Sequence, residues 1–268
     1  MRTVSKALKI LDLFTEDAPV LGLAEIAALT GLDRATCHRM LKVFEEHGYV
    51  TRSLGSKKYT LGATVLRLAR TREFISPTTP ALQAIVDALA QKTTETCHAS
   101  LIAGQQIATV AVKDGTRSNR VHVGFGARIS PHATATGLIC LAYGNADFVE
   151  HGLADPLPAY TPFTTTDVKA LQTLVSTFRK QGFSVADRSF DSDVIGIGVP
   201  FFGADAMAAG ALATATPASR MDDATLRGTV ELLTEAAFEA TNALGGRMPD
   251  DFLRSAAINR TPKSQATG

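Results

Sequence analysis

The sequence predicts an α+β protein of two domains, in which a small helical domain with a β-hairpin precedes a larger domain of mixed helices and strands. Three observations predict this. The chain has 268 residues, which is the length of two domains. Residues 1–75 hold short amphipathic helical patterns and one pair of β-prone runs. The remainder places β-prone runs in adjacent pairs between helices, which indicates a mainly antiparallel sheet rather than a doubly wound parallel one.

Composition and charge describe a globular chain with a mildly basic front. Hydrophobic residues make up 45% and charged residues 20% of the sequence, enough to bury real cores. The net charge is only +1, yet residues 1–75 carry about +4 and the rest about −3. This separation predicts that the two parts interact with different partners.

Cysteine usage and the apolar runs predict where the chain resides. The cysteines at 37, 97 and 140 match no zinc spacing and no disulfide framework, which is typical of a reduced cytoplasmic protein. The first residues lack the unbroken apolar core of a signal peptide, and no run approaches the length of a membrane span. We therefore expect a cytoplasmic protein with no membrane partner.

Residues 1–60 show the element order of a winged helix-turn-helix. Apolar residues at helical spacing predict a first helix over 4–14, and "LAEIAALTG" predicts a short second one. Asp33 is placed to cap a third helix, which Gly48 ends. The runs "YVTRS" and "KKYTL" flank a turn with a glycine and predict a hairpin, the wing. A linker helix is expected over 61–76, before the prolines of "ISPTTP".

The second domain is expected over residues 77–248. An amphipathic helix over 79–92 opens it, and a long helix over 222–243 closes it. The strands expected between them are "CHASLI", "QIATVAV", "RVHVGFG", "FSVAD", "VIGIGVPFF" and "AAGALATAT". The tail, residues 249–268, mixes Ser, Thr, Lys, Pro and Gly and is expected to be disordered.

The third helix of the first domain carries a polar set on its outward phases. These positions are Arg34, Ala35, Thr36, His38 and Arg39. An α-helix fits the major groove of B-DNA, and the first turns of a recognition helix reach the base edges. Arg39 can form a bidentate contact with guanine, whereas Arg52, Lys57 and Lys58 are placed to neutralise phosphates. Each residue alone is more often part of a solvated surface, but together with the element order they predict binding to double-stranded DNA.

Signatures of enzymes are weak. The sequence has no G-x-S-x-G and no P-loop, and its G-x-G fragments at 124–126 and 196–198 lack a third glycine at dinucleotide spacing. No two histidines are three to five residues apart. A metal pair could still assemble in space from Cys97, His98, His122 and His132, but ordinary core or surface roles are favoured. We therefore expect no catalytic residue, no metal and no cofactor.

The ordered blocks resemble the IclR-type bacterial transcription regulators over about residues 4–243. The matching runs are "VSKALKILDLF", "LAEIAALTGLDRATCHRMLKVFEEHGYV", "KKYTLGATVLRLA", "ETCHASLIAGQQIATVAV", "VGFGARISPHATATGLICLAYG", "YTPFTTTDVKALQTLVSTFRKQGFSV" and "ALATATPASRM". The resemblance implies that a linker helix joins the winged domain to a GAF-like α+β domain that binds a small-molecule effector. It also implies a homodimer, often a dimer of dimers, on a palindromic operator.

The resemblance further implies which residues contact the effector. Carried over by motif, they are Ala135, Thr136, Asp187, Val194, Gly196, Ala213 and Ala215. Leu138 stands where the family usually has Lys, and Ser189 stands where an acidic residue is common. The family often has Cys or Ser at the positions of Gly196, Ala213 and Ala215. These departures suggest a roomier, less polar pocket and a larger or more apolar effector, with simple repacking of the core as an equal alternative.

The function expected is therefore a DNA-binding transcriptional regulator, controlled by an organic acid or aromatic metabolite. Two alternatives stay open. One is an enzyme that transforms a small molecule and is fused to a DNA-binding module. The other is a second domain that serves dimerisation alone. The sequence determines neither the effector, nor the operator, nor whether the effector releases or strengthens DNA binding.

Overall fold

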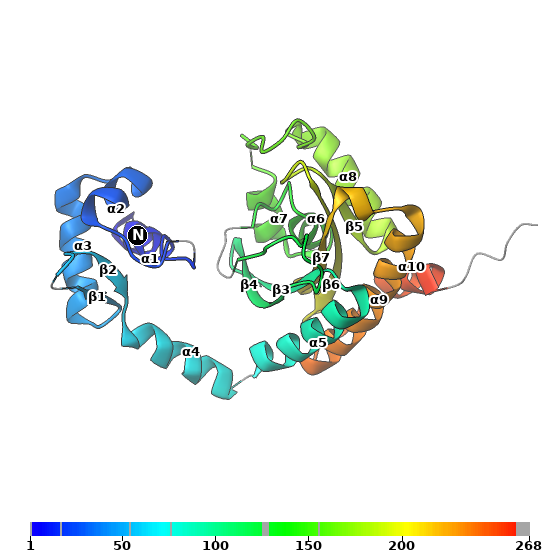
Figure 1. Ribbon diagram of the computed structural model, residues 1–268, viewed down its shortest axis with the longest axis horizontal. Coiled ribbons are helices and arrows are strands. Elements are labelled where there is room, and N and C mark those ends of the chain that lie inside the picture. The colour runs from blue at the N-terminus through cyan, green and yellow to red at the C-terminus, as the bar shows by residue number, and fades with distance from the viewer. Residues whose placement is uncertain are drawn as a thin grey trace, which may run out of the picture. The chain divides into compact units, whose positions relative to one another are not determined.

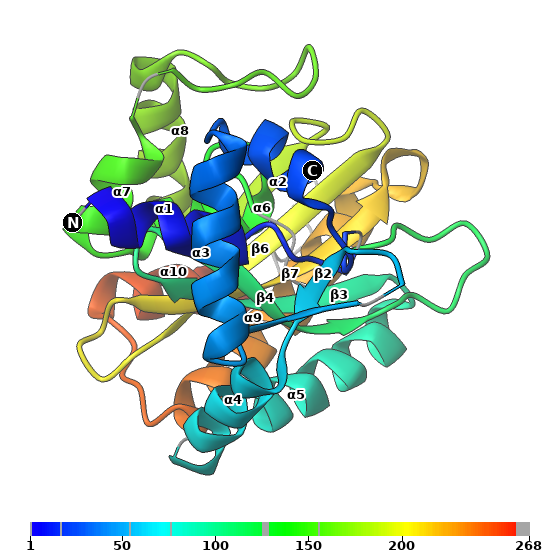
Figure 2. The ribbon, with the colours of Figure 1, turned by 90° about the vertical axis from the view of Figure 1, so that its left-hand side faces the viewer.

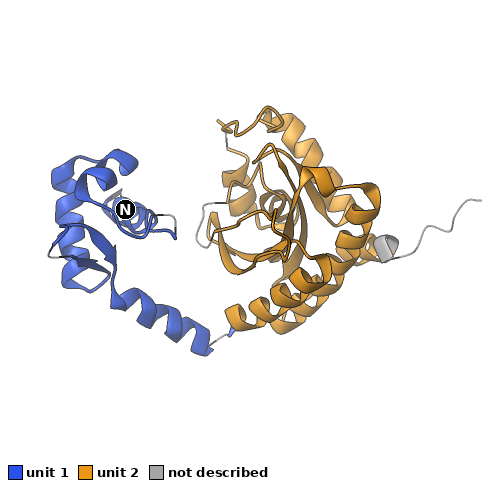
Figure 3. Cartoon of the chain, viewed as in Figure 1, with its two compact units in different colours: residues 1–77 blue, residues 78–268 orange. Residues whose placement is uncertain are grey.

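The computed structural model describes residues 2–16, 18–53, 55–75, 77–124, 129–154 and 156–260. The chain divides into two compact units, residues 1–77 and residues 78–268 (Figure 3). Among the described residues, no helix is both long and apolar enough to span a membrane.

Unit 1 is a helix-turn-helix with a short hairpin. Its elements are α1 (Arg2–Leu11), α2 (Leu23–Thr30), α3 (Arg34–Glu46), β1 (Val50–Arg52), β2 (Tyr59–Leu61) and α4 (Ala63–Ile75) (Figure 1). Fully buried Ile10, Ile26 and Leu41 bring the first three helices together. The buried Tyr59 exchanges two backbone hydrogen bonds with Leu21, so the hairpin is fixed to the segment before α2.

Unit 2 contains a five-stranded antiparallel sheet, as the pairing of adjacent strands predicted. The strands are β3 (Thr96–Ala103), β4 (Gln106–Lys113), β5 (Ser184–Asp187), β6 (Val194–Phe202) and β7 (Ala208–Pro217). Their order in the sheet is β4-β3-β7-β6-β5, and every neighbouring pair is antiparallel. Because β3 pairs with both β4 and β7, its side chains lie near the middle of the sheet.

Helices cover both faces of this sheet (Figure 1). They are α5 (Thr78–Thr93), α6 (Ala135–Tyr143), α7 (Ala146–Gly152), α8 (Val168–Gln181), the 3-10 turn η1 (Ala218–Arg220), α9 (Asp223–Ala243) and α10 (Asp250–Arg260). Helices α5 and α9 pack together on one face, and α6 packs on the other with α8 outside it. All nine residues of α6 are buried, which explains why its sequence is apolar all round.

The expectation of a disordered tail over residues 249–268 is wrong for residues 250–260, which form α10. Phe252 is 1% exposed and its ring packs against those of Tyr143 and Phe202. Phe252 and the buried Ala256 are four residues apart, so they share one helical face. Two apolar residues at that spacing outweigh the polar composition around them. Residues 261–268 lie outside the described part of the chain.

The strand expected at "RVHVGFG" is also wrong for residues 120–124, which form no regular element. A side-chain hydrogen bond and an ion pair hold this segment, and it joins no strand ladder. The hydroxyl of Thr96 donates to the carbonyl of Val121 at 2.6 Å, and Arg120 pairs with Asp114 at 3.1 Å. Phe125 and Gly126 lie outside the described residues.

Candidate DNA interface and effector site

The N-terminus of α3 is built around one capping carboxylate. Asp33 accepts a hydrogen bond from the backbone amide of Thr36 at 2.8 Å and another from the Thr36 hydroxyl at 2.7 Å. The cap satisfies amide hydrogens that a helix start leaves without partners. Both hydrogen bonds stabilise the charged form of Asp33 and so hold its pKa below its usual value. The bond from the Thr36 hydroxyl has the larger effect and the bond from the amide the smaller. Asp33 is therefore an ionised cap, as the sequence predicted.

The cap also positions a cation. A terminal guanidinium nitrogen of Arg39 donates to the Thr36 hydroxyl oxygen at 3.1 Å. The Thr36 hydroxyl thus gives its proton to Asp33 and accepts from Arg39. This chain of bonds fixes the exposed Arg39 beside the first turn of α3.

The predicted outward face of α3 is open to solvent. Arg34, Ala35, His38 and Arg39 are exposed and Thr36 is half-buried, whereas Cys37 and Leu41 are fully buried. Figure 2 shows α3 between α1 and α2 on one side and the hairpin of β1 and β2 on the other, within unit 1. The apolar face of α3 is therefore buried in unit 1, and the polar face is accessible to a partner.

The hairpin presents three further cations. The Arg52 guanidinium lies 5.6 Å from the centroid of the Tyr59 ring, and Lys58 lies 3.8 Å from a carboxylate oxygen of Glu25. Lys57 has φ +55°, the left-handed conformation of a tight turn. All three cations are exposed. A surface ion pair such as Lys58–Glu25 contributes little to stability. Lys58 can therefore leave Glu25 for a phosphate at a small cost in free energy.

In unit 2, strand register brings together five of the seven predicted effector residues. Gly196 pairs with Ala215 and shares a sheet face with Ala213, because residues two apart on a strand point the same way. A Cβ placed on Gly196 would lie 3.1 Å from the Cβ of Ala135, the first residue of α6. Thr136 follows on that helix. We call Ala135, Thr136, Gly196, Ala213 and Ala215 the effector cluster.

The other two predicted residues are placed differently. Val194 pairs with Pro217 at the start of β6, shares the sheet face of Gly196, two residues further along the strand, and is half-buried. Asp187 pairs with Ile195, so alternation along the strand directs it to the opposite face from Gly196. Its carboxylate is exposed and accepts a hydrogen bond from Arg188 at 2.8 Å.

The small residues of β6 have a structural role. A Cβ on Gly198 would lie 2.8 Å from the carbonyl oxygen of Ala135, closer than real side chains allow. Ser184 fixes the same carbonyl by donating to it at 2.7 Å. Glycine at 198 therefore lets the first turn of α6 rest directly on the sheet. Close packing accounts for this glycine without any effector.

The sequence did not single out His98 as an effector residue, although it lies at this cluster. His98 pairs with Ala213 across the sheet, and its Nε2 shares a hydrogen bond of 3.0 Å with the Thr136 hydroxyl. Burial lowers the pKa of His98 to about 4, so the ring is neutral near pH 7. Within the described residues its buried Nδ1 has no hydrogen-bond partner. The sequence contains a signal that could have indicated this residue: the polar Thr96, His98 and Ser100 alternate with apolar residues, so they share one face of the strand.

Cys97, His98, His122 and His132, the side chains considered for a metal pair, belong to no larger set of ligands: in the part of the chain that the structure describes, no group of three or more His, Cys, Asp or Glu side chains could hold a metal ion. Cys97 and His98 are neighbours on β3 and so point to opposite faces. Burial raises the pKa of the Cys97 thiol to about 12, which disfavours the thiolate that a metal needs.

A capped, basic helix in a helix-turn-helix unit, carried with a separate sheet domain, defines the class of DNA-binding transcriptional regulators. The family follows from comparison with known proteins. The chain belongs to the IclR family: the IclR helix-turn-helix domain matches residues 3–53, and the bacterial transcriptional regulator IclR C-terminal domain matches residues 78–241.

Known proteins are similar over nearly the whole chain. The transcriptional regulator XynR of Escherichia coli is 28% identical over 91% of this chain and 98% of its own. A putative IclR transcriptional regulator from Silicibacter sp. TM1040 superposes with a TM-score of 0.86 at 35% identity, over 93% of this chain and 99% of that one. An IclR homologue from Microbacterium hydrocarbonoxydans, complexed with 4-hydroxybenzoate, shares the fold with a TM-score of 0.73 at 22% identity, over 91% and 99%.

Proposed function

We propose that this IclR-family regulator binds a palindromic operator as a homodimer or dimer of dimers, and that a small organic effector in unit 2 controls its affinity. The observation that carries the DNA part is the chain of hydrogen bonds from Asp33 through Thr36 to Arg39. A guanidinium fixed in this way loses less side-chain entropy when it meets guanine. The exposed position of Arg39 leaves its fork free to do so.

The other proposed DNA contacts divide by chemistry. Arg34, Ala35, Thr36 and His38 face the bases or the adjacent backbone, and Arg52, Lys57 and Lys58 face phosphates. Two copies of α3 in a dimer would occupy half-sites about 34 Å apart, or a multiple of that, on one face of the duplex. A change of a few ångströms in their spacing would release one half-site.

The effector is proposed to bind at the effector cluster, with His98 as an added polar contact. The two small residues of β7 and the neutral His98 favour a ligand that is largely apolar but offers an oxygen to the imidazole. Val194 and Asp187 enter the proposed set through the family resemblance. Since one structural neighbour is complexed with 4-hydroxybenzoate, aromatic acids are the first ligands to test.

Coupling between the two units is proposed to change operator affinity by about 5- to 150-fold, the usual range for allosteric proteins. Effector binding would act through α6, because this helix carries two cluster residues and rests directly on β6. Relatives of the chain are transcriptional regulators, and we propose that unit 2 senses its ligand without converting it.

Selection of bound sequences from random duplex DNA, followed by a titration, tests this function. The full chain should enrich one palindromic sequence, and a compound from a panel of organic and aromatic acids should both raise the melting temperature and shift the operator affinity. Enrichment of no sequence would overturn the DNA part. Consumption of the stabilising compound by the protein would instead establish the enzyme alternative.

A further inference from the structure

The effector cluster is closed to solvent at its side chains. Ala135, Thr136, Ala213 and Ala215 are each at most 6% exposed, and Gly196 is half-buried. A small molecule can contact these residues only after a neighbouring segment has moved aside. If the cluster binds an effector, some part of unit 2 therefore opens.

The cluster lies near the end of the sheet where β6 begins and β7 ends. The N-terminus of α6 points to this end, since its first residue, Ala135, contacts Gly196 near the start of β6. Its last residue, Tyr143, packs against Phe202, the last residue of β6. Residues 188–193, which we call the β5–β6 turn, join β5 to β6 at the same end. This turn therefore borders the space in front of α6.

Three side-chain hydroxyls hold the β5–β6 turn. The Ser189 hydroxyl donates to the carbonyl of Ala133, two residues before α6, at 2.7 Å. From the loop that follows α7, the Thr164 hydroxyl donates to the carbonyl of Ser189 at 2.6 Å. The Thr161 hydroxyl of the same loop donates to the carbonyl of Arg188 at 2.7 Å. Ser189, Thr161 and Thr164, which we call the clasp, thus join the turn to the loop and to the segment before α6.

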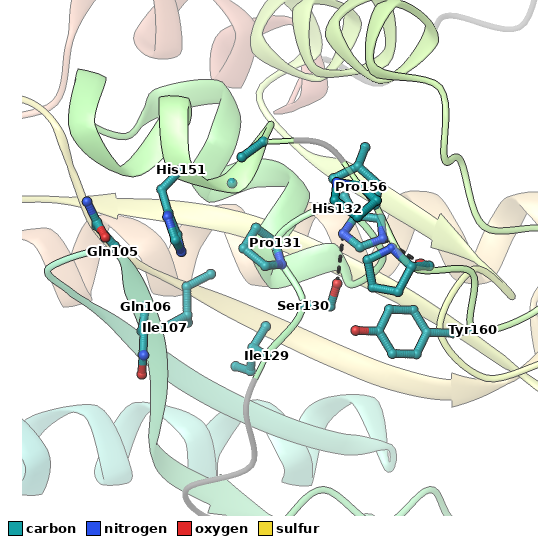
Figure 4. A pocket seen from close by; sticks show the side chains of 14 residues that line it. Gln105, Gln106, Ile107, Ile129, Ser130, Pro131, His132, His151, Pro156 and Tyr160 are labelled. Carbon is teal, nitrogen blue, oxygen red and sulfur yellow. Dashed lines mark hydrogen bonds between the residues drawn. The ribbon is translucent and has the colours of Figure 1, made fainter. Parts of the chain in front are cut away.

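The loop that follows α7 is itself bound to the segment before α6. The Nε2 of His132 lies 2.8 Å from the carbonyl oxygen of Pro158, and its Nδ1 lies 3.0 Å from the Ser130 hydroxyl (Figure 4). The Tyr160 ring contacts two others, its centroid lying 5.8 Å from that of His132 and 4.9 Å from that of Phe190 in the turn. The loop therefore holds the turn and the segment before α6 together.

The closed conformation of the turn depends on these contacts. Arg188 has φ +56°, a left-handed conformation that residues other than glycine adopt at a cost in free energy. Its guanidinium carbon lies 4.4 Å from the centroid of the Phe163 ring in the loop. Within the turn, all of which the structure describes, only Ser189 is buried, and residues 190–193 are exposed. Opening the turn would thus expose little additional apolar surface, which is typical of segments that open locally.

We propose that the β5–β6 turn is a gate through which an effector reaches the cluster, and that the clasp holds this gate closed. Ser189 is the central member of the clasp, because its hydroxyl bonds to Ala133 and its carbonyl accepts from Thr164. Opening exchanges these hydrogen bonds for bonds to water, so its net cost is small. Opening itself requires no effector, whereas the passage of an effector rests on the proposed function.

The helix and strands that carry the cluster are held more firmly than the turn. All nine residues of α6 are buried. Strands β6 and β7 pair with one another over their whole length, and β7 also pairs with β3. Movement of these elements would disrupt the core or the sheet, whereas the turn is held largely by side-chain contacts. The turn is therefore the segment that can open at the smallest cost.

Labelling of an introduced thiol measures access to the cluster in the full chain without an effector. Ala215→Cys places the thiol at a buried cluster position, and 4,4′-dithiodipyridine, a flat aromatic disulfide, is the probe. Labelling should be slow while the clasp is intact. Addition of Ser189→Ala should speed it about five- to thirty-fold, because loss of a buried hydrogen bond shifts the opening equilibrium by such a factor. Ala213→Cys provides a second labelled position should the first variant fail to fold.

Two native thiols distinguish local opening from unfolding of the whole domain. Cys97 and Cys140 are fully buried, on β3 and on α6. Mass spectrometry of peptides assigns the label to each cysteine. Both native thiols should react far more slowly than the thiol at position 215 after Ser189→Ala. Equal acceleration of all three would mean that the domain unfolds as a whole, and would overturn the gate.

Matched variants test whether the effect belongs to the clasp. Ser255 resembles Ser189, since it is buried and its hydroxyl donates to a distant carbonyl, that of Lys180 at 2.8 Å. Ser255→Ala should leave labelling of the cluster unchanged. Thr164→Val, which removes another hydroxyl of the clasp, should speed labelling, and Thr164→Ser, which keeps the hydroxyl, should not.

Three further results would overturn the proposal. One is rapid labelling of Ala215→Cys with an intact clasp, since the cluster would then already be open. Another is an unchanged rate after Ser189→Ala, which would place the entrance elsewhere. The third is equal acceleration by Ser255→Ala, which would reflect a general loosening of unit 2. Failure of the proposed function is distinguishable from these, because a chain that no compound of the panel stabilises can still show the opening.

Discussion

The Nε2 of His98 lies 3.0 Å from the hydroxyl of Thr136, so one hydrogen bond joins the centre of the sheet to the first turn of α6. His98 is 9% exposed and its Nδ1 is unpartnered within the described residues. An unsatisfied buried nitrogen is unfavourable, and a ligand oxygen would satisfy it. This hydrogen bond therefore belongs both to the packing of α6 on the sheet and to the proposed effector site.

The first prediction concerns the pH dependence of stability. Burial lowers the pKa of His98 from 6.5 to about 4, so below pH 6.5 the unfolded chain takes up a proton that the folded chain does not. Stability therefore falls as the pH falls, and this group should contribute a loss of about 2 kcal/mol between pH 7.5 and 5.0. Urea unfolding of the wild type and His98→Gln at both pH values measures it. An equal loss in the two proteins would show that His98 is not buried as described.

The second prediction concerns Arg39. Replacement by Ala should weaken binding to the selected operator by about 1–3 kcal/mol and relax the preference at one base pair. Fluorescence anisotropy with the operator and with single-base variants measures both effects. Lys92→Ala, an equal charge change at an exposed residue of unit 2, should leave binding unchanged. An equal loss on every sequence would mean that Arg39 contacts phosphate only.

The third prediction concerns Thr36 as a positioning residue. Thr36→Val removes the hydroxyl that links Asp33 to Arg39 while it keeps the side-chain shape. Operator affinity and base preference should both fall, because the guanidinium loses its anchor. Thr36→Ser restores the hydroxyl and should restore both. If Thr36→Val and Thr36→Ser bind equally well, the hydroxyl does not position Arg39.

The fourth prediction concerns the wing. Replacing Lys57 and Lys58 should weaken binding evenly on all sequences, and should reduce the slope of log K against log salt by about one for each phosphate that is no longer neutralised. Lys57 should be changed to Asn, since Asn tolerates the φ of +55° at this position. Titrations at several salt concentrations measure the slope. An unchanged slope would remove the wing from the DNA interface.

The fifth prediction concerns a bidentate ion pair between the residue before β3 and the 3-10 turn that follows β7. Arg220 donates to both carboxylate oxygens of the buried Glu95, at 2.8 and 2.7 Å. Arg220→Ala leaves Glu95 with Arg117 at 3.8 Å as its remaining cation, and should cost about 1–3 kcal/mol of unfolding free energy. Arg120→Ala breaks an exposed pair and should cost far less. Chemical denaturation compares the two variants.

Much of the fold could be predicted because its signals are local. Asp33 before a helix and the glycines at 48 and 182 mark helix ends through the short-range geometry of caps. Where the prediction was wrong, distant contacts decide the structure. Residues 250–260 form a helix because Phe252 finds Tyr143 and Phe202 far away in the sequence.

The sequence by itself determined the α+β class, the order of the elements in the helix-turn-helix unit and the outward phase of α3. Each of these depends on periodicity and capping, which act over a few residues. Only the tertiary structure decided that His98 meets Thr136 and that Asp187 faces away from Gly196. It alone decided that Pro131 packs closely against Gly137 of α6 and Gly152 of α7. Such relationships depend on strand register and close packing between segments far apart in the chain, which no local pattern encodes.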